Sequence, residues 1–309
     1  MSRMTPLPGE SALVRALLNG EFAVTAEIVP LSSDPTALTA RAQLLKGVVD
    51  AVNVTDGAGA RSHMSSLVAA GLLVREGIEP VLQFTCRDRN RIALQSDVLG
   101  AGALGIHNIL VLGGDDPKAG DQPDAKPVFD LGTAELIAMM RMMSEDSKTP
   151  SGRTIESPPR LFLGAADSPF DPPPDWRPDR LAEKAEAGAR FVQTQFCYDV
   201  DIVRRYIGRL AEAGLTQRLF ILLGTGPIAS AKSARWMREN LWGVIIPDVL
   251  IERLENAADE RAEGRRICVE FIEQVREIDG VAGVHVMAIR QDEAIPGILA
   301  DAKAGPAYR

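Results

Sequence analysis

The chain has 309 residues, of which 46% are hydrophobic and 25% charged, and its net charge is −8 at pH 7. These proportions are typical of a globular protein, and the acidic balance argues against nucleic acid or an anionic membrane as partner. The three cysteines (Cys86, Cys197 and Cys268) are too widely spaced to indicate zinc or a disulfide framework. Because we find no signal peptide and no membrane-spanning run, we expect a cytoplasmic protein.

Strand and helix patterns alternate along the chain after a loose arm over residues 1–8 and a helix over 9–19. Apolar, β-favouring segments predict eight strands, at 22–29, 50–55, 80–85, 108–112, 160–166, 190–195, 218–224 and 284–290. Helical spacing predicts helices from about 35 and over 62–76, 90–101, 133–143, 180–187, 201–213, 230–239 and 257–278. Long polar loops follow the fourth and fifth strands.

Eight strands alternating with helices have the count and size of a (β/α)₈ TIM barrel. Parallel strands need crossover connections, and a helix is available for each of them. We therefore predict one barrel domain over residues 1–309, with an extra N-terminal helix and long loops after strands four and five. A doubly wound sheet also alternates in this way and stays an alternative.

The segment Asn108–Pro117 combines a buried strand with a polar loop that starts Gly113-Gly114-Asp115. Loops at the carboxyl ends of parallel strands form the ligand site of α/β proteins. Paired glycines allow the backbone to approach a flat or bulky group, with Asp115 at its edge. The plain alternative is a tight turn that caps a helix.

The other strand ends carry mostly carboxylate, amide and small side chains. They are Glu27, Thr55, Gln83, Ala166, Gln193, Gln195, Gly224 and Arg290. His63, His107 and His285 lie too far apart along the strand series to predict a metal site, and no nucleophile elbow is present. The glycine pairs at 57–59 and 224–226 do not continue into a dinucleotide-binding fingerprint. This set suits a bulky hydrogen-bonding organic ligand and a carboxylic acid that handles a proton.

Three motifs together resemble the methylenetetrahydrofolate reductase family: residues 26–30, AEIVP; 111–117, VLGGDDP; and 186–195, EAGARFVQTQ. Residues 164–170 and 284–290 are similar to one bacterial branch of it. The resemblance runs from about residue 22 to 298. It implies a (β/α)₈ barrel that holds FAD at its mouth and reduces 5,10-methylenetetrahydrofolate to 5-methyltetrahydrofolate.

The resemblance also assigns roles to individual residues. Glu27 stands at the position of the proton donor that opens the methylene bridge, and Asp115 at that of the aspartate that stabilises positive charge on the folate. The positions implied for folate binding are Gln193, Gln195 and Arg290. The positions implied for flavin binding are Thr55, Gln83, Gly113, Gly114, Asp115, Asp130, Ala166 and Lys184.

The sequence departs from the better-known members at three of these places. Gln83 replaces a histidine, and Arg290 is displaced by about one position. The loop after the seventh strand, residues 226–231, has Ala231 or a neighbour of it where those members have an aromatic residue that packs against the nicotinamide dinucleotide and folate. The electron donor therefore stays open between NADH, NADPH and a redox partner protein.

Two other functions remain compatible with the same residues. The site could run oxidatively on 5-methyltetrahydrofolate in one-carbon catabolism, because direction depends on the potential of the electron partner. Alternatively, the chain could be a flavin- or folate-binding subunit that needs a companion protein. The resemblance also implies a homo-oligomer, since family members are usually dimers or tetramers.

Overall fold

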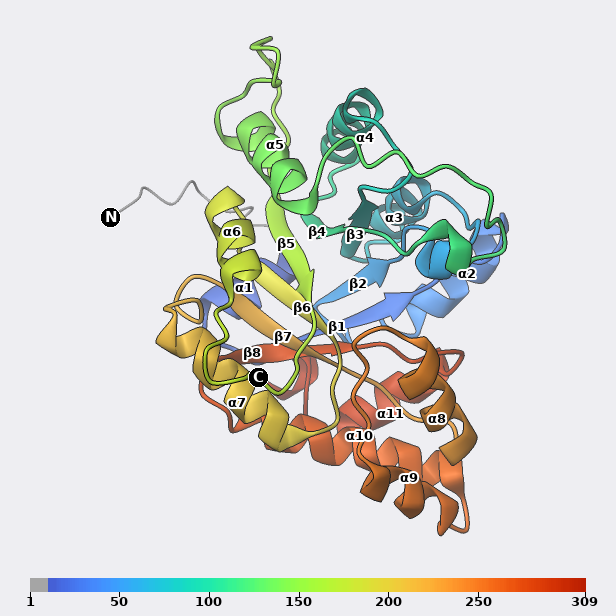
Figure 1. Cartoon of the computed structure of the whole chain (residues 1–309). Helices are drawn as coiled ribbons and strands as arrows, with labels where there is room; N and C mark the ends of the chain where they lie inside the picture. The colour runs from blue at the N-terminus through green and yellow to red at the C-terminus, as the bar shows by residue number, and fades with distance from the viewer. Residues whose placement is uncertain (1–10) are drawn as a thin grey trace.

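The computed structural model describes residues 11–309, and in it eight parallel strands pair in chain order and close into a barrel (Figure 1). The strands are β1 (Ala23–Ile28), β2 (Ala51–Val54), β3 (Pro80–Thr85), β4 (Asn108–Leu112), β5 (Phe162–Asp167), β6 (Phe191–Phe196), β7 (Phe220–Thr225) and β8 (Val281–Val286). The predicted (β/α)₈ barrel is confirmed. The doubly wound alternative is wrong, because β8 pairs in parallel with β1.

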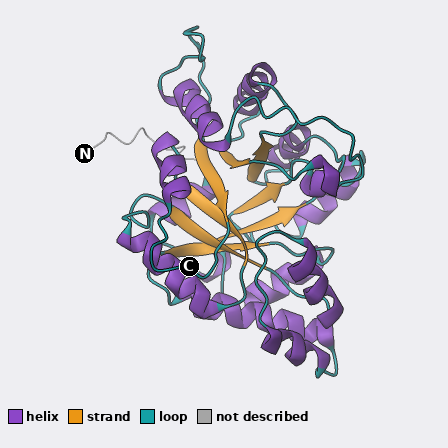
Figure 2. Cartoon of the chain, viewed as in Figure 1, coloured by secondary structure: helices purple, strands orange, loops and turns teal. Residues whose placement is uncertain are grey.

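Helices surround the strands on the outside of the barrel (Figure 2). They are α1 (Ala12–Leu18), α2 (Pro35–Gln43), α3 (Ser66–Arg75), α4 (Arg91–Ala103), α5 (Thr133–Glu145), α6 (Asp179–Ala187), α7 (Val200–Glu212), α8 (Ala231–Asn240), α9 (Asp248–Glu255), α10 (Glu260–Arg276) and α11 (Ile295–Asp301). The arm predicted over residues 1–8 lies outside the described part of the chain. Within residues 11–309, no helix has both the length and the apolar character needed to cross a bilayer.

The predicted extra helix, α1, closes the amino-terminal end of the barrel. Its apolar side chains join the barrel interior, where Phe162 and Phe191 stack with their ring centroids 4.9 Å apart. Glu79 holds the start of α1, since its carboxylate accepts hydrogen bonds from Ser11 Oγ (2.6 Å) and from the backbone N–H of Ala12 (2.5 Å). A ligand site must therefore use the opposite end, where the strands finish.

The long loop after β4 packs against the loop after β2. It contains a 3₁₀ turn, η2 (Pro117–Ala119), and this turn contacts another, η1 (Ala58–Ala60). Gly120 passes so close that a Cβ there would lie 2.0 Å from the carbonyl oxygen of Ala60. The long loops predicted after strands four and five are present, and this one forms part of the rim of the barrel.

Several predicted boundaries are wrong, those of the helices α3 and α10 and of the strand β8 among them. β8 spans 281–286 rather than 284–290, so Arg290 lies in the following loop, with φ of +55°. The strand begins earlier than its apolar run because Gly283 passes against β1, where a Cβ would meet the Ala23 carbonyl oxygen at 2.1 Å. The helix α9 was not predicted, and the helix predicted over 257–278 is the shorter α10.

Candidate functional site

Inside the barrel, polar side chains from four strands form a buried layer below the mouth. They are Thr25, Asn53, Gln193 and His285, each no more than 2% exposed. Gln193 Nε2 donates to Thr25 Oγ1 (2.8 Å) and to Asn53 Oδ1 (3.0 Å). Asn53 Nδ2 in turn donates to Gln193 Oε1 (2.6 Å). The amide of Gln193 is therefore occupied within this polar layer, so Gln193 lies in the floor of the site rather than on its rim.

Glu27 lies on the mouth side of this layer. Its Oε2 accepts a hydrogen bond from Gln83 Nε2 (2.8 Å) and lies 3.7 Å from His285 Nε2. The side chain is 21% exposed, so it is reachable from the mouth. Both contacts use the same oxygen, which leaves Oε1 to meet a ligand. The structure thus brings Glu27 of β1 and Gln83 of β3 together across the barrel mouth, although β2 lies between their strands.

His285 links Glu27 to the polar layer and was not predicted as a functional residue. Its Nδ1 lies 2.9 Å from Thr25 Oγ1, while Nε2 faces Glu27. Two residues of β1, Thr25 and Glu27, therefore hold the imidazole ring at its two nitrogen atoms. The available signal was a lone imidazole in the eighth strand, but the strand predicted over 284–290 puts His285 at its start, whereas β8 ends at Val286 and so brings His285 near the mouth.

Two of the positions implied for flavin binding have features that fit a bound group. Thr55 Oγ1 is buried and has no hydrogen-bond partner among residues 11–309. A buried hydroxyl without a partner costs about 1–3 kcal/mol, which a ligand that supplies one would offset. Gly113 has no atom within 4 Å of where a Cβ would lie, so there is room for a flat group above it.

Asp115 ties the loops after β2 and β4 together. Its carboxylate accepts a hydrogen bond from Gly59 N–H (2.8 Å). Beneath it, the buried Arg87 donates to the Asp115 carbonyl (3.1 Å) and to the Gly57 carbonyl (3.2 Å). Gly114 has φ of +94°, and a Cβ added to it would lie only 2.9 Å from the Cβ of Arg87. Arg87 was not predicted as a site residue. Its two hydrogen bonds to backbone carbonyls hold the loop that carries Asp115 in place.

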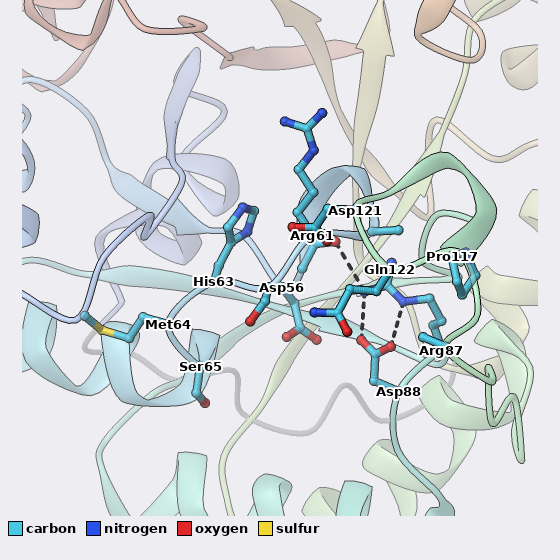
Figure 3. A pocket seen from close by; sticks show the side chains of 14 residues that line it. Asp56, Arg61, His63, Met64, Ser65, Arg87, Asp88, Pro117, Asp121 and Gln122 are labelled. Carbon is cyan, nitrogen blue, oxygen red and sulfur yellow. Dashed lines mark hydrogen bonds and ion pairs between the residues drawn. The ribbon is translucent and has the colours of Figure 1, made fainter.

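A cavity of about 290 Å³ lies among the loops after β2, β3 and β4 (Figure 3). Arg61 and His63 come from the first of these loops, and dashed lines join Arg87 to Asp88. Burial lowers the pKa of His63. The lining includes none of the predicted site residues, but it borders them, because Arg87 lines the cavity and donates to the Asp115 carbonyl.

The remaining positions implied for the cofactor fall into two places. Lys184 Nζ donates to the Ala166 carbonyl (2.8 Å), and burial lowers the pKa of this lysine. Asp130 instead pairs with Arg91 at the start of α4 (2.8 Å), and hydrogen bonds from Arg91 lower the pKa of Asp130 to about 2. The structure therefore joins Lys184 to Ala166 but does not join Asp130 to the other predicted residues through a hydrogen bond.

The two other positions implied for folate binding lie on the rim. Gln195, near the end of β6, donates from Nε2 to the Trp242 carbonyl (3.2 Å) and accepts from Phe196 N–H (3.0 Å). Arg290 is exposed in the loop after β8. No group of three or more His, Cys, Asp or Glu side chains that could hold a metal ion occurs in residues 11–309.

Comparison with known proteins identifies relatives over most of this chain. Residues 13–303 match the family model described as methylenetetrahydrofolate reductase. The chain is 25% identical to a probable methylenetetrahydrofolate reductase (NADPH) of Caenorhabditis elegans, over 76% of this chain and 34% of that protein. It is also 25% identical to the 5,10-methylenetetrahydrofolate reductase of Salmonella typhimurium, over 78% of this chain and 76% of that protein. The chain thus spans about a third of the nematode relative and three quarters of the bacterial one.

A solved structure shares the fold over most of the chain. It is an uncharacterised protein from Clostridium thermocellum that binds two copies of 5-methyl-5,6,7,8-tetrahydrofolic acid. The TM-score is 0.66 at 15% identity, and the match covers 94% of this chain and 98% of the other. At this identity the likeness shows a common barrel architecture.

Proposed function

The chain belongs to the methylenetetrahydrofolate reductase family of oxidoreductases, and on that premise we propose that it reduces 5,10-methylenetetrahydrofolate to 5-methyltetrahydrofolate with a bound FAD. The observation that carries this proposal is the position of Glu27. Its carboxyl group is held by Gln83 and His285 on rigid strands and remains open to the barrel mouth. Such a group can deliver a proton to a ligand bound there.

Glu27 acts as the acid in this proposal. Oε2 is kept in place by Gln83, and a proton carried on Oε1 passes to a bridge nitrogen of the folate. The carbon–nitrogen bond then breaks, and the methylene carbon becomes an electrophilic iminium. FAD, when bound and reduced, supplies the hydride that this carbon accepts to become the methyl group.

Asp115 stabilises the positive charge that develops on the folate. Its carboxylate is exposed and is oriented by the Gly59 amide, so its negative charge is available at the rim. Gln195 and Arg290 bind the folate from the rim, and Gln193 supports it from the floor. This arrangement separates the two carboxylates by environment, a usual way to give them different roles.

The groups proposed to hold FAD are Thr55, Gln83, Gly113, Gly114, Asp115, Ala166 and Lys184. The unpartnered hydroxyl of Thr55 and the open space above Gly113 support this fit. Asp130 would have to exchange its pairing with Arg91 to contact the cofactor. NADH, NADPH or a redox partner protein would reduce the flavin, and assembly into a homo-oligomer in the cytoplasm stays a prediction.

The test is the visible spectrum of the purified protein, followed by an anaerobic reduction and reoxidation cycle. We expect a flavin spectrum that bleaches on reduction and returns on addition of methylenetetrahydrofolate, with 5-methyltetrahydrofolate as product. Bleaching by dithionite but not by NADH or NADPH would assign the electron donor to a partner protein. No flavin binding even with added FAD, or no reoxidation by the folate, would overturn the proposal.

The oxidative alternative is distinguished with the same protein. Oxidised enzyme is mixed with 5-methyltetrahydrofolate, and flavin bleaching is followed over time. Fast bleaching together with slow reoxidation by methylenetetrahydrofolate would reverse the proposed direction.

A further inference from the structure

Among the large apolar side chains of residues 11–309, that of Trp242 is the most exposed, at 84%. An indole has a large, flat apolar surface that a second aromatic ring can cover. Trp236 on α8 is 52% exposed and provides a natural comparison in the same protein. A single exposed apolar side chain is ordinary, so the position of Trp242, and not its exposure alone, decides what it can bind.

The backbone of Trp242 lies at the mouth of the barrel. Its carbonyl oxygen accepts the hydrogen bond from Gln195 Nε2 at 3.2 Å. Three residues later, Ile245 N–H donates to the Phe196 carbonyl (3.1 Å), and Tyr198 N–H donates to the Ile245 carbonyl (2.9 Å). The segment thus continues the carboxyl end of β6 as a short parallel bridge, on the rim where Gln195 is proposed to bind folate.

The turn that carries the indole is firmly anchored, although the indole itself is free. Gly243 has φ of +76°, and the place of its Cβ is only 2.8 Å from Ser168 Oγ in the loop after β5. The next residue, Val244, is buried and donates from its N–H to the Leu241 carbonyl (3.3 Å). The chain turns at Gly243, which has a left-handed conformation. Trp242 before the turn stays in solvent, and Val244 after the turn is buried.

We propose that Trp242 is a substrate-recognition residue whose indole packs on a flat aromatic ring of the folate bound beside Gln195. This inference rests on the proposed function. Folates contain a pterin and an aminobenzoyl ring, and flat π-systems bind aromatic faces by stacking. The rim near Trp242 is otherwise polar, with Gln195 and Ser168, and the loop at 226–231 has no aromatic residue. Polar groups orient the ring edges, and the indole supplies the apolar face.

The experiment compares Trp242→Ala and Trp242→Phe with Trp236→Phe as the matched control. Dissociation constants for 5-methyltetrahydrofolate are measured on the flavin-loaded protein by calorimetry and by quenching of tryptophan emission. Steady-state assays give KM and kcat for methylenetetrahydrofolate. We expect Trp242→Ala to raise KM and Kd about tenfold, as loss of a stacked ring does, with kcat changed by less than about threefold.

Trp242→Phe keeps an aromatic face, so we expect folate affinity within about threefold of wild type. This variant should lose most of the folate-induced quenching, whereas Trp236→Phe should keep it. Light scattering on each variant records the oligomeric state.

The outcomes separate the inference from the proposed function. Folate Kd within twofold of wild type in Trp242→Ala, in an enzyme that still turns over, would overturn the inference alone. A Trp242→Ala variant that dissociates into smaller units without losing folate affinity would also overturn it, by assigning the indole to a subunit interface. A wild-type protein that neither binds nor reduces folate would overturn both.

Discussion

At the scale of single residues, the two predicted catalytic carboxylates occupy different surroundings. Glu27 projects from a rigid strand toward an amide and an imidazole, whereas Asp115 lies on a glycine loop and accepts a backbone N–H. The strand position restricts Glu27 to one geometry, which suits directed proton transfer. The exposed loop leaves the Asp115 side chain accessible to a ligand at the rim.

Glu27→Gln should leave FAD content unchanged while slowing the folate half-reaction by about 10²- to 10⁴-fold, the usual contribution of a general acid. The carboxamide keeps the size of the side chain but cannot supply an acidic proton. Stopped-flow reoxidation of the reduced enzyme by methylenetetrahydrofolate measures the effect. Glu76→Gln, at an exposed helix end, is the control and should not change the rate. A Glu27→Gln rate within a few-fold of wild type would exclude Glu27 as the acid.

Thr55→Val and Thr25→Val should have opposite effects on stability. Thr55 Oγ1 has no partner in the described part of the chain, so its removal should stabilise the apoprotein by about 1 kcal/mol and weaken FAD binding several-fold. Thr25 Oγ1 contacts His285 and Gln193, so its loss should destabilise the protein by about 1–3 kcal/mol. Urea unfolding and FAD titration measure both. Equal destabilisation by the two changes would contradict the assignment of Thr55 to the cofactor.

At the scale of elements, the helix α1 closes the amino-terminal end of the barrel and is not part of the proposed site. Its side chains fill the amino-terminal end of the barrel, and its first N–H groups bind the Glu79 carboxylate. A carboxylate at a helix N-terminus satisfies free donors and complements the helix dipole. The contacts that anchor α1 and the proposed site therefore lie at opposite ends of the same strands.

Glu79→Ala should lower the free energy of unfolding by about 1–3 kcal/mol, because the start of α1 loses its acceptor. Glu76→Ala is the control, because Glu76 is exposed and lies three residues before Glu79. This variant should change the free energy of unfolding by less than about 0.5 kcal/mol. Chemical denaturation of the two variants provides the comparison. If both variants unfolded at the wild-type denaturant concentration, Glu79 would not be what anchors α1.

Element boundaries were harder to predict than element types. The buried strands β3 and β4 read directly from their apolar runs, because both faces of a barrel strand avoid water. β8 was misplaced because it begins with a partly exposed, glycine-containing stretch. α9 was missed because it is short and lies between two longer helical patterns.

At the scale of the whole molecule, the three cysteines report on the integrity of the barrel. Cys86 follows β3, Cys197 follows β6 and Cys268 lies in α10, and each is at most 1% exposed. Burial raises the pKa of Cys86 to about 11 and those of Cys197 and Cys268 to about 12. The thiols therefore stay protonated and inaccessible at pH 8, where a free thiol would partly ionise.

Native protein at pH 8 should show no fast reaction with a disulfide reagent, and denaturant should release all three thiols in one transition. The reason is that the thiols are distributed over one closed barrel, which we expect to unfold as a single domain. Thiol labelling is followed in parallel with circular dichroism across a urea series. Release of one cysteine well before the loss of helical signal would show that part of the barrel opens independently.

The sequence by itself determined the strand count, the alternation of strands with helices, and the carboxylate and amide residues at the strand ends, whereas closure into a barrel was decided by the pairing of β8 with β1. Burial and periodicity are local properties of a chain, so they can be read without coordinates. Only the tertiary structure decided that His285 faces Glu27, that Gln193 lies in the floor and that Arg87 supports the Asp115 loop. These contacts join residues distant in sequence, and their geometry depends on barrel closure and loop packing, which no single segment specifies.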